Sequence, residues 1–180
     1  MKYISFLRGI NVSGQNKILM DELKSLYESL GFENVLTYIQ SGNVIFEAKE
    51  KDALALSSGI EEAIARKYAF NVPVVIRTHN ELKKILKNCP FGNVDLQKDG
   101  SRVLVSFLMS PPSAENMNSL LEYVVAPESL VNHGREIYLY CPNGYGKSKL
   151  SNNFIEKKLQ RVATSRNWNS ILKLHELSSG

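Results

Sequence analysis

Polar side chains that could bind a ligand are concentrated in two turns of the N-terminal half. One set follows the first apolar run of the chain and the other follows the second, each next to a glycine. These side chains are Arg8, Asn11, Asn16, Lys17, Gln40, Ser41 and Asn43. They include two cations and no carboxylate, and the glycines let backbone N–H groups approach a ligand. This combination favours an anionic or amide-bearing ligand.

The same residue types also have a structural use. Asn and Ser side chains often close turns by binding nearby backbone groups, and Arg8 could cap a backbone carbonyl. At the level of the sequence, this alternative stands beside the ligand-binding one.

A further candidate is the run 144–148, Gly-Tyr-Gly-Lys-Ser, between a predicted strand and a predicted helix. Backbone amides and a helix N-terminus can bind phosphate in that setting. The run resembles the end of a GxxxxGK[ST] loop, but Cys141 stands where the motif requires its first glycine, so it is not a P-loop. We expect a looser phosphate or carboxylate site that uses Tyr145, Lys147, Ser148 and Lys149. The alternative is a helix N-cap flanked by solvated lysines.

The charge of the chain is unevenly placed. The net charge is +4, but residues 144–173 hold seven basic residues and one acidic residue, which gives this segment +6. Lys157, Lys158 and Arg161 have the spacing of one helical face, and Arg166 follows them. The C-terminal region therefore carries a positive field that suits a phosphate-bearing ligand, although a solvated surface would explain the charges equally well.

The sequence indicates no catalytic or metal chemistry. It has no paired carboxylates, no GxSxG motif and no Cys/His pairing, and Cys89 and Cys141 belong to no CxxC motif. His79, His133 and His175 are scattered along the chain. We expect no cofactor and no metal, and the sequence leaves open whether the protein is an enzyme.

Hydrophobic periodicity predicts an α+β fold. Strands are expected at 2–8, 35–40, 44–46 and 72–76, with helices at 20–30 and 56–67, which is the βαββαβ order of a ferredoxin-like split βαβ unit. Because the first two strands of such a unit run parallel, the two polar turns should emerge at one sheet edge. Asp52 is predicted to start the second helix, and Thr78 with Glu81 to form a capping box for a connecting helix.

A second cycle of elements follows a linker rich in Gly, Asn and Asp. We expect a strand at 103–109, a helix from Ser113, a hairpin around residues 132–134, a strand at 137–141, a helix from about 148–151 and a last helix at 168–177. The cycle repeats the first topology without a visible sequence repeat. The prediction is two ferredoxin-like halves in tandem, at 1–90 and 102–180, with a linker at 91–101.

Apolar residues fall on both faces of the first strand and of the strand at 72–76. Such sheets are covered on both sides, which argues against an open RNA-binding sheet with exposed aromatic residues. We expect helices on one face and either the other half or a partner chain on the second face, which would make that face a dimer surface. No apolar run approaches ~20 residues and no signal peptide is visible, so we expect a cytoplasmic protein with no membrane role.

Three segments resemble a bacterial family of uncharacterised proteins, domain of unknown function 1697. They are residues 8–18 (RGINVSGQNKI), residues 37–46 (TYIQSGNVIF), and residues 144–150 (GYGKSKL) with 163–168 (ATSRNW). The family pattern usually has Gly where this chain has Ser13, and often Arg where it has Lys147. The resemblance implies two ferredoxin-like units and no established biochemical role.

Three functions are compatible with these observations. The first is a binding protein for a phosphate-bearing ligand, a nucleotide or a nucleic acid, that uses the glycine-rich loops and the basic C-terminal region. The second is a metal-independent enzyme acting on a small anionic metabolite. The third is a protein interaction module, with a homodimer as one form.

Overall fold

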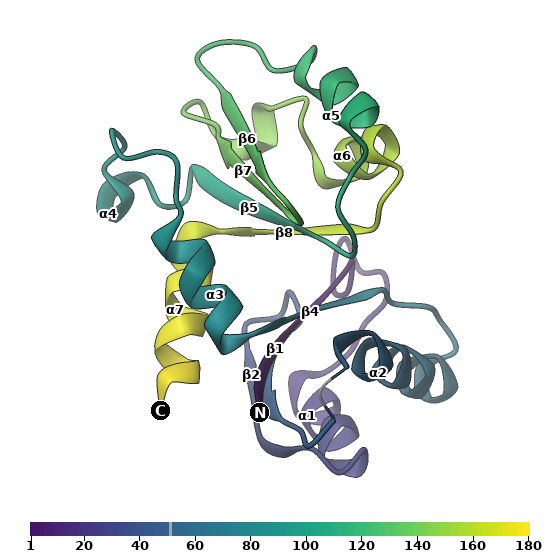
Figure 1. Ribbon diagram of the computed structural model, residues 1–180. Coiled ribbons are helices and arrows are strands. Elements are labelled where there is room, and N and C mark those ends of the chain that lie inside the picture. Colours follow the sequence, from purple (N-terminus) through teal and green to yellow (C-terminus); the bar gives the residue numbers. More distant parts are fainter. Residues whose placement is uncertain (51) are drawn as a thin grey trace. The chain divides into compact units, whose positions relative to one another are not determined.

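The computed structural model describes residues 1–50 and 52–180 (Figure 1). Its elements are β1 (Lys2–Leu7), α1 (Met20–Ser29), β2 (Glu33–Tyr38), β3 (Asn43–Glu47), α2 (Ala53–Tyr68), β4 (Val74–Thr78), α3 (His79–Lys87), α4 (Leu96–Asp99), β5 (Val103–Leu108), α5 (Ala114–Leu121), β6 (Ser129–His133), β7 (Glu136–Tyr140), η1 (Tyr145–Lys147), α6 (Asn152–Leu159), β8 (Ala163–Asn167) and α7 (Trp168–Ser179). The chain divides into two compact units. Unit 1 comprises Met1–Lys83 and Lys173–Gly180, and unit 2 comprises Lys84–Leu172.

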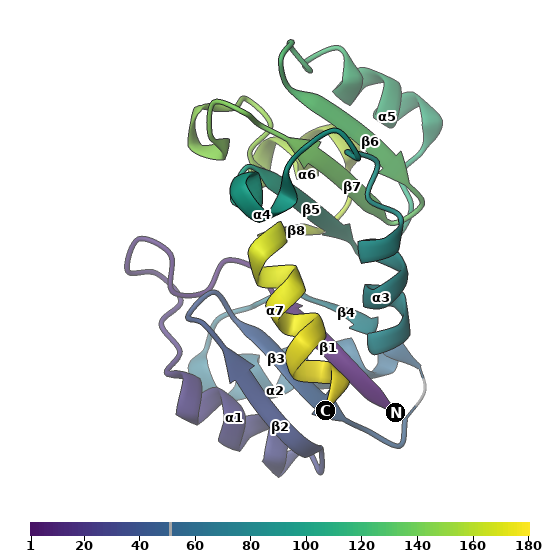
Figure 2. The ribbon, with the colours of Figure 1, turned by 90° about the vertical axis from the view of Figure 1, so that its left-hand side faces the viewer.

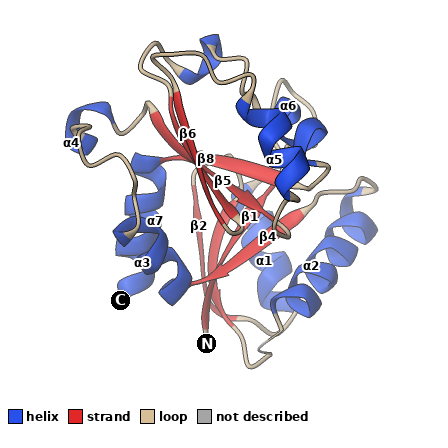
Figure 3. Ribbon diagram, turned by 45° about the horizontal axis from the view of Figure 1, so that its top comes forward, coloured by secondary structure: helices blue, strands red, loops and turns tan. Residues whose placement is uncertain are grey.

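Unit 1 has the predicted βαββαβ order. Its four strands pair in the order β2-β3-β1-β4, and every neighbouring pair is antiparallel, as Figure 2 shows for β2, β3 and β1. β1 and β2 therefore run parallel, and the loops that follow them leave the same edge of the sheet. α1 and α2 cover one face (Figure 3), where Tyr3 and Leu7 of β1 pack with Tyr27 of α1 and Ile60 of α2.

Unit 2 repeats this arrangement. Its sheet has the antiparallel order β6-β7-β5-β8, and α5 and α6 pack on one face. Hydrophobic periodicity predicts only three strands in this unit and does not predict β8. The reason is its composition, because Ala163–Asn167 reads Ala-Thr-Ser-Arg-Asn and has no aliphatic side chain larger than alanine. Each unit is thus a complete ferredoxin-like βαββαβ fold.

The unit bounds differ from the predicted halves at 1–90, 91–101 and 102–180. Unit 2 begins at Lys84, inside α3, and residues 91–101 belong to it. That segment contains α4, whose start is capped by Asp95, and Phe91 is only 6% exposed. The end of α7, from Lys173, belongs to unit 1.

Several predicted helix starts are confirmed by their hydrogen bonds. The Asp52 carboxylate accepts from the Leu54 N–H at the start of α2. Thr78 and Glu81 form the reciprocal capping box of α3, with the Thr78 N–H donating to Glu81 at 2.7 Å and the Glu81 N–H donating to Thr78 Oγ1 at 3.1 Å. Ser113 accepts from Asn116 N–H at the start of α5.

Both faces of β1 are buried, as predicted. Ile4 and Phe6, which point away from α1 and α2, are as inaccessible as Tyr3 and Leu7. No helix in the described ranges is long and apolar enough to cross a membrane.

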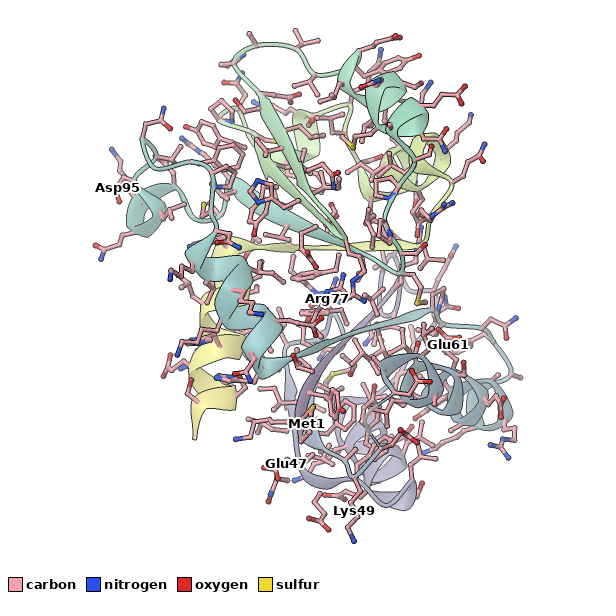
Figure 4. The ribbon with its side chains drawn as sticks, in the orientation of Figure 1. Met1, Glu47, Lys49, Glu61, Arg77 and Asp95 are labelled. Atoms are coloured by element: carbon pink, nitrogen blue, oxygen red, sulfur yellow. The ribbon has the colours of Figure 1, made fainter. Side chains whose placement is uncertain are left out.

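The two units also share a buried arginine at matching places. Arg77 of β4 pairs with Ile4 of β1, and Arg166 of β8 pairs with Val105 of β5. Arg77 (Figure 4) is 1% exposed and Arg166 is 8% exposed. The equivalence exposes a short repeat, because Ser5-Phe6-Leu7 of β1 then matches residues 106–108 of β5, which also read Ser-Phe-Leu.

Candidate functional site

The loop after β1 is held by the side chain of Asn11. Its Nδ2 donates to the carbonyl oxygens of Ile18, at 3.0 Å, and Gln40, at 2.9 Å, while its Oδ1 accepts from the Ile18 N–H at 2.9 Å. The predicted meeting of the two polar turns is therefore present. Asn11 joins them through backbone groups of the protein itself.

Other predicted residues of this edge also bind the backbone. Asn16 donates to the Gly9 carbonyl at 3.2 Å, and Asn43, which is fully buried, donates to the Tyr38 carbonyl at 3.0 Å and to Ser41 Oγ at 3.1 Å. These bonds are the turn-closing use that the sequence left open.

The loop backbone is in a left-handed conformation at several residues. Asn11 and Asn16 have φ of 55° and 48°, which asparagine tolerates better than most residues. Ser13 has φ of 50°, so it takes a conformation that suits glycine, the residue usual at this place in the family pattern. The loop tip, together with Lys17 and Gln40, is exposed, and Arg8 is half-buried with its N–H bound to the Pro73 carbonyl.

In unit 2, the run 144–148 does not lead directly into a helix. Gly144 has φ of 95° and precedes the single turn η1, after which the chain becomes extended at Ser148. Ser151, not Ser148, caps α6 by accepting from the Phe154 N–H at 3.3 Å. The helix start predicted at about 148–151 is therefore confirmed at Ser151, while Ser148 closes a local turn by accepting from the Leu150 N–H.

Two predicted residues of this region have buried polar groups. Arg166 donates to Thr164 Oγ1 at 2.7 Å and to the Ser165 carbonyl at 2.9 Å, and burial lowers its pKa to about 10, which still leaves it charged at neutral pH. The Tyr145 hydroxyl lies in the unit interior beside Ser165, and burial raises the pKa of this phenol. Neither group is placed to contact a large ligand at the surface of unit 2.

Two lysines from separate segments converge on one aromatic ring. Lys158 Nζ of α6 lies 4.3 Å from the centroid of Tyr123 and 3.0 Å from its hydroxyl oxygen. Lys149 Nζ lies 5.6 Å from the same centroid. Phe154 packs edge-on against Tyr123, with centroids 5.0 Å apart, and fixes the ring. We call Lys149, Lys158, Tyr123 and Phe154 the lysine cluster.

The lysine cluster lacks a neutralising carboxylate. In the part of the chain that the structure describes, no Asp or Glu forms an ion pair with Lys149 or Lys158. The Glu156 carboxylate of α6 accepts from the Ala163 N–H instead. Both ammonium groups lie within cation–π distance of the Tyr123 ring, and an anion bound beside this ring would be attracted by both charges.

An open hollow of 620 Å³ adjoins the cluster along the chain. It is lined by Arg102, Glu128, Pro142, Asn143, Gly144 and Lys147. Arg102 also forms an ion pair with Asp99 at 3.1 Å. Lys147 is exposed, and only Ser148 separates it from Lys149 in the sequence, so the Cα atoms of the two lysines lie within about 7 Å of each other.

The predicted helical face of three basic residues is wrong at Arg161. α6 ends at Leu159, Gln160 takes the left-handed conformation, and the Arg161 guanidinium turns back to the Gln160 and Pro111 carbonyls. Lys157 and Lys158 remain on the helix. No local sequence pattern indicates Arg102, Tyr123 or Phe154, because only tertiary packing brings Tyr123 and Phe154 to Lys158, and Arg102 to the hollow with Lys147.

Comparisons with known proteins support the fold and leave the site undescribed. Residues 1–138 match the family described as "Protein of unknown function (DUF1697)". The solved structure of the conserved bacterial protein SP0830 from Streptococcus pneumoniae is similar, with a TM-score of 0.77 and 25% identity, covering 98% of this chain and 97% of that one. No curated protein matches the sequence. The run 144–148 and α6 lie beyond the residues that match the family.

Proposed function

Because the chain belongs to the DUF1697 family, whose function is unknown, we propose a function from its own side chains: unit 2 binds the phosphate backbone of a nucleic acid. The observation that carries the proposal is the lysine cluster, in which Lys149 and Lys158 both lie by the Tyr123 ring and neither pairs with a carboxylate of the described residues. Two such ammonium groups can neutralise phosphates of a nucleic-acid backbone, and the counterions that are then released favour binding.

The aromatic side chains support contact with the backbone more than with the bases. Stacking of a base needs an open ring face, whereas Lys158 Nζ lies over the ring of Tyr123. The cluster therefore offers charge without a means to read sequence, and binding should be insensitive to base composition.

A nucleic acid fits this surface better than a single nucleotide. The lining of the 620 Å³ hollow includes no aromatic side chain to hold a base, and it includes Glu128, which would repel a triphosphate placed deep inside. Arg102 and Lys147 at this hollow, with the lysine cluster beside it, instead form a series of cations that can follow a polymer.

Binding of a fluorescent oligonucleotide, followed by anisotropy, tests the proposal. We expect the double variant Lys149→Ala/Lys158→Ala to bind more weakly than the wild type for every sequence tried. The matched control is Lys24→Ala/Lys67→Ala in unit 1, which removes the same charge, and Lys67 also lies over a tyrosine ring, 5.2 Å from the centroid of Tyr68. Equal loss in both double variants would contradict the assigned surface, and so would displacement of the oligonucleotide by a mononucleotide at similar concentration.

A further inference from the structure

A second hollow, in unit 1, is lined by hydrogen-bond donors. It has a volume of 440 Å³ and is lined by Met1, Lys2, Thr78, His79, Asn80, Ser178 and Ser179. These residues come from β1, the junction of β4 with α3, and the end of α7. Met1 and Glu47, labelled in Figure 4, lie at this end of the sheet, where Lys2 pairs with Glu47 across the strands. No carboxylate belongs to the lining.

His79 is fixed in this hollow by two contacts with α7. Its ring stacks on the ring of His175, with centroids 5.0 Å apart and an interplanar angle of 17°. Its Nδ1 lies 2.8 Å from Ser178 Oγ, and Ser178 is only 2% exposed. The ring is therefore held in one orientation, and Nδ1 is engaged within the protein.

The charged groups around His79 are mainly positive. Burial, His175, Lys2 of β1 and Lys83 of α3 all lower the pKa of His79. Two carboxylates are near. Glu47 of β3 lies 3.9 Å from Lys2 Nζ, and Glu81 of α3 is bound to the N–H and hydroxyl of Thr78.

Neither carboxylate neutralises the histidine. Within the described ranges, His79 forms no ion pair with any Asp or Glu. His175 cannot help, because its own Nε2 is buried without a hydrogen-bond partner among the described residues. A protonated His79 thus lacks a counter-ion in a hollow that is open to one.

We propose that this hollow is a binding site for a small phosphate-bearing anion, held by the Lys2 ammonium, the Asn80 amide and the protonated ring of His79. The site lies in unit 1 and is independent of the nucleic-acid surface of unit 2. Lys2 supplies the fixed charge, and His79 adds a second charge only when it takes up a proton.

Binding at this site is linked to protonation. An anion beside His79 favours the imidazolium, so the anion raises the pKa of His79 and, reciprocally, binds more tightly as the pH falls. In the absence of the anion, a fall in pH instead destabilises the folded protein. Because the folded pKa is below the ordinary value of about 6.5, the unfolded chain takes up the proton first, and stability falls as the pH drops below that value.

Proton NMR of the intact protein tests the proposal, because the chain has only three histidines. The pH titration of His79 is compared in inorganic phosphate and in sodium chloride of equal ionic strength, with the exposed His133 as internal reference. Phosphate at ten times its dissociation constant should raise the midpoint of His79 by up to about one pH unit relative to chloride. The midpoint of His133 should be the same in both salts.

Two variants locate the effect. Lys2→Gln should abolish the phosphate-dependent shift of His79, and Lys2→Arg should keep it, while the dispersion of the spectrum reports whether each variant is folded. A midpoint of His79 that is equal in phosphate and chloride would overturn the proposal, as would a phosphate shift that persists in Lys2→Gln. Neither result depends on whether unit 2 binds nucleic acid.

Discussion

Asn11 uses both ends of its side-chain amide to hold the loop that follows β1. Three hydrogen bonds join it to the backbone of Ile18 and Gln40, at 2.9 to 3.0 Å. Its backbone is left-handed, with φ of 55°. A residue that could have been a ligand contact is instead the link between the two loops at this edge of the unit 1 sheet.

Removal of this amide should destabilise the protein. We expect Asn11→Ala to lower the free energy of unfolding by about 3 kcal/mol or more, since each of the three bonds contributes ~1 kcal/mol and alanine is strained at positive φ. Asn11→Gly also removes the three hydrogen bonds, but glycine adopts positive φ without strain, so this variant should lose less stability than Asn11→Ala. Urea denaturation measures both, with Gln15→Ala at the exposed loop tip as the control. Equal stability of the wild type and Asn11→Ala would refute the structural role.

Gly42 is a second residue on which this edge depends. It has φ of +81°, and a Cβ there would lie 2.7 Å from Ile10 Cδ1 and 2.8 Å from Leu7 Cβ. Gly42→Ala should therefore destabilise by more than about 2 kcal/mol, through both backbone strain and overpacking. Gly92→Ala is the matched control, because a Cβ at Gly92 meets no atom within 4 Å. Equal melting temperatures of Gly42→Ala and Gly92→Ala would contradict this account of the turn.

At the scale of elements, α6 connects the basic residues to the core of unit 2. Ile155 and Leu159 are buried in the core, while Lys157 is exposed and Lys158 lies on Tyr123. The start of the helix depends on Ser151, whose hydroxyl accepts from the Phe154 N–H. The cap therefore fixes the register that brings Lys158 to the aromatic ring.

The cap can be tested separately from the charges. Ser151→Ala should lower stability by about 1 kcal/mol, and Ser151→Asp should preserve it, because aspartate is an equally good N-cap and favours the helix dipole. Lys157→Ala, an exposed change on the same helix, should stay within about 0.5 kcal/mol of the wild type. Denaturant midpoints would show this order, and a Ser151→Ala variant as stable as Lys157→Ala would contradict the assigned helix start.

Elements with apolar periodicity could be predicted from the sequence, and those without it could not. The capping pairs at Asp52 and at Thr78 with Glu81 are local patterns, and the structure confirms both. β8 escaped prediction because its buried residues are alanine, threonine and arginine, which pack in a sheet only when the neighbouring β5 is in place. The lysine cluster escaped for a related reason, since Tyr123 and Lys158 meet only through tertiary packing.

At the scale of the whole molecule, the chain repeats one fold in two units whose polar surfaces differ. Both units have the same strand order, a matching Ser-Phe-Leu run in the first strand and a buried arginine in the last strand. The loops differ more than the sheets do. In unit 1 the polar loop residues mostly bind the protein backbone, whereas in unit 2 a different surface collects Lys149 and Lys158, which pair with no carboxylate of the described residues.

The salt dependence of oligonucleotide binding tests the central proposal most directly. For the wild type, the logarithm of the association constant should fall linearly with the logarithm of the salt concentration, with a slope of about −0.7 for each neutralised phosphate of a single strand. Lys149→Ala/Lys158→Ala should reduce the magnitude of the slope by about 1.4, since each lysine that neutralises a phosphate accounts for ~0.7. A flat salt response, or an unchanged slope in the double variant, would contradict phosphate binding by the lysine cluster.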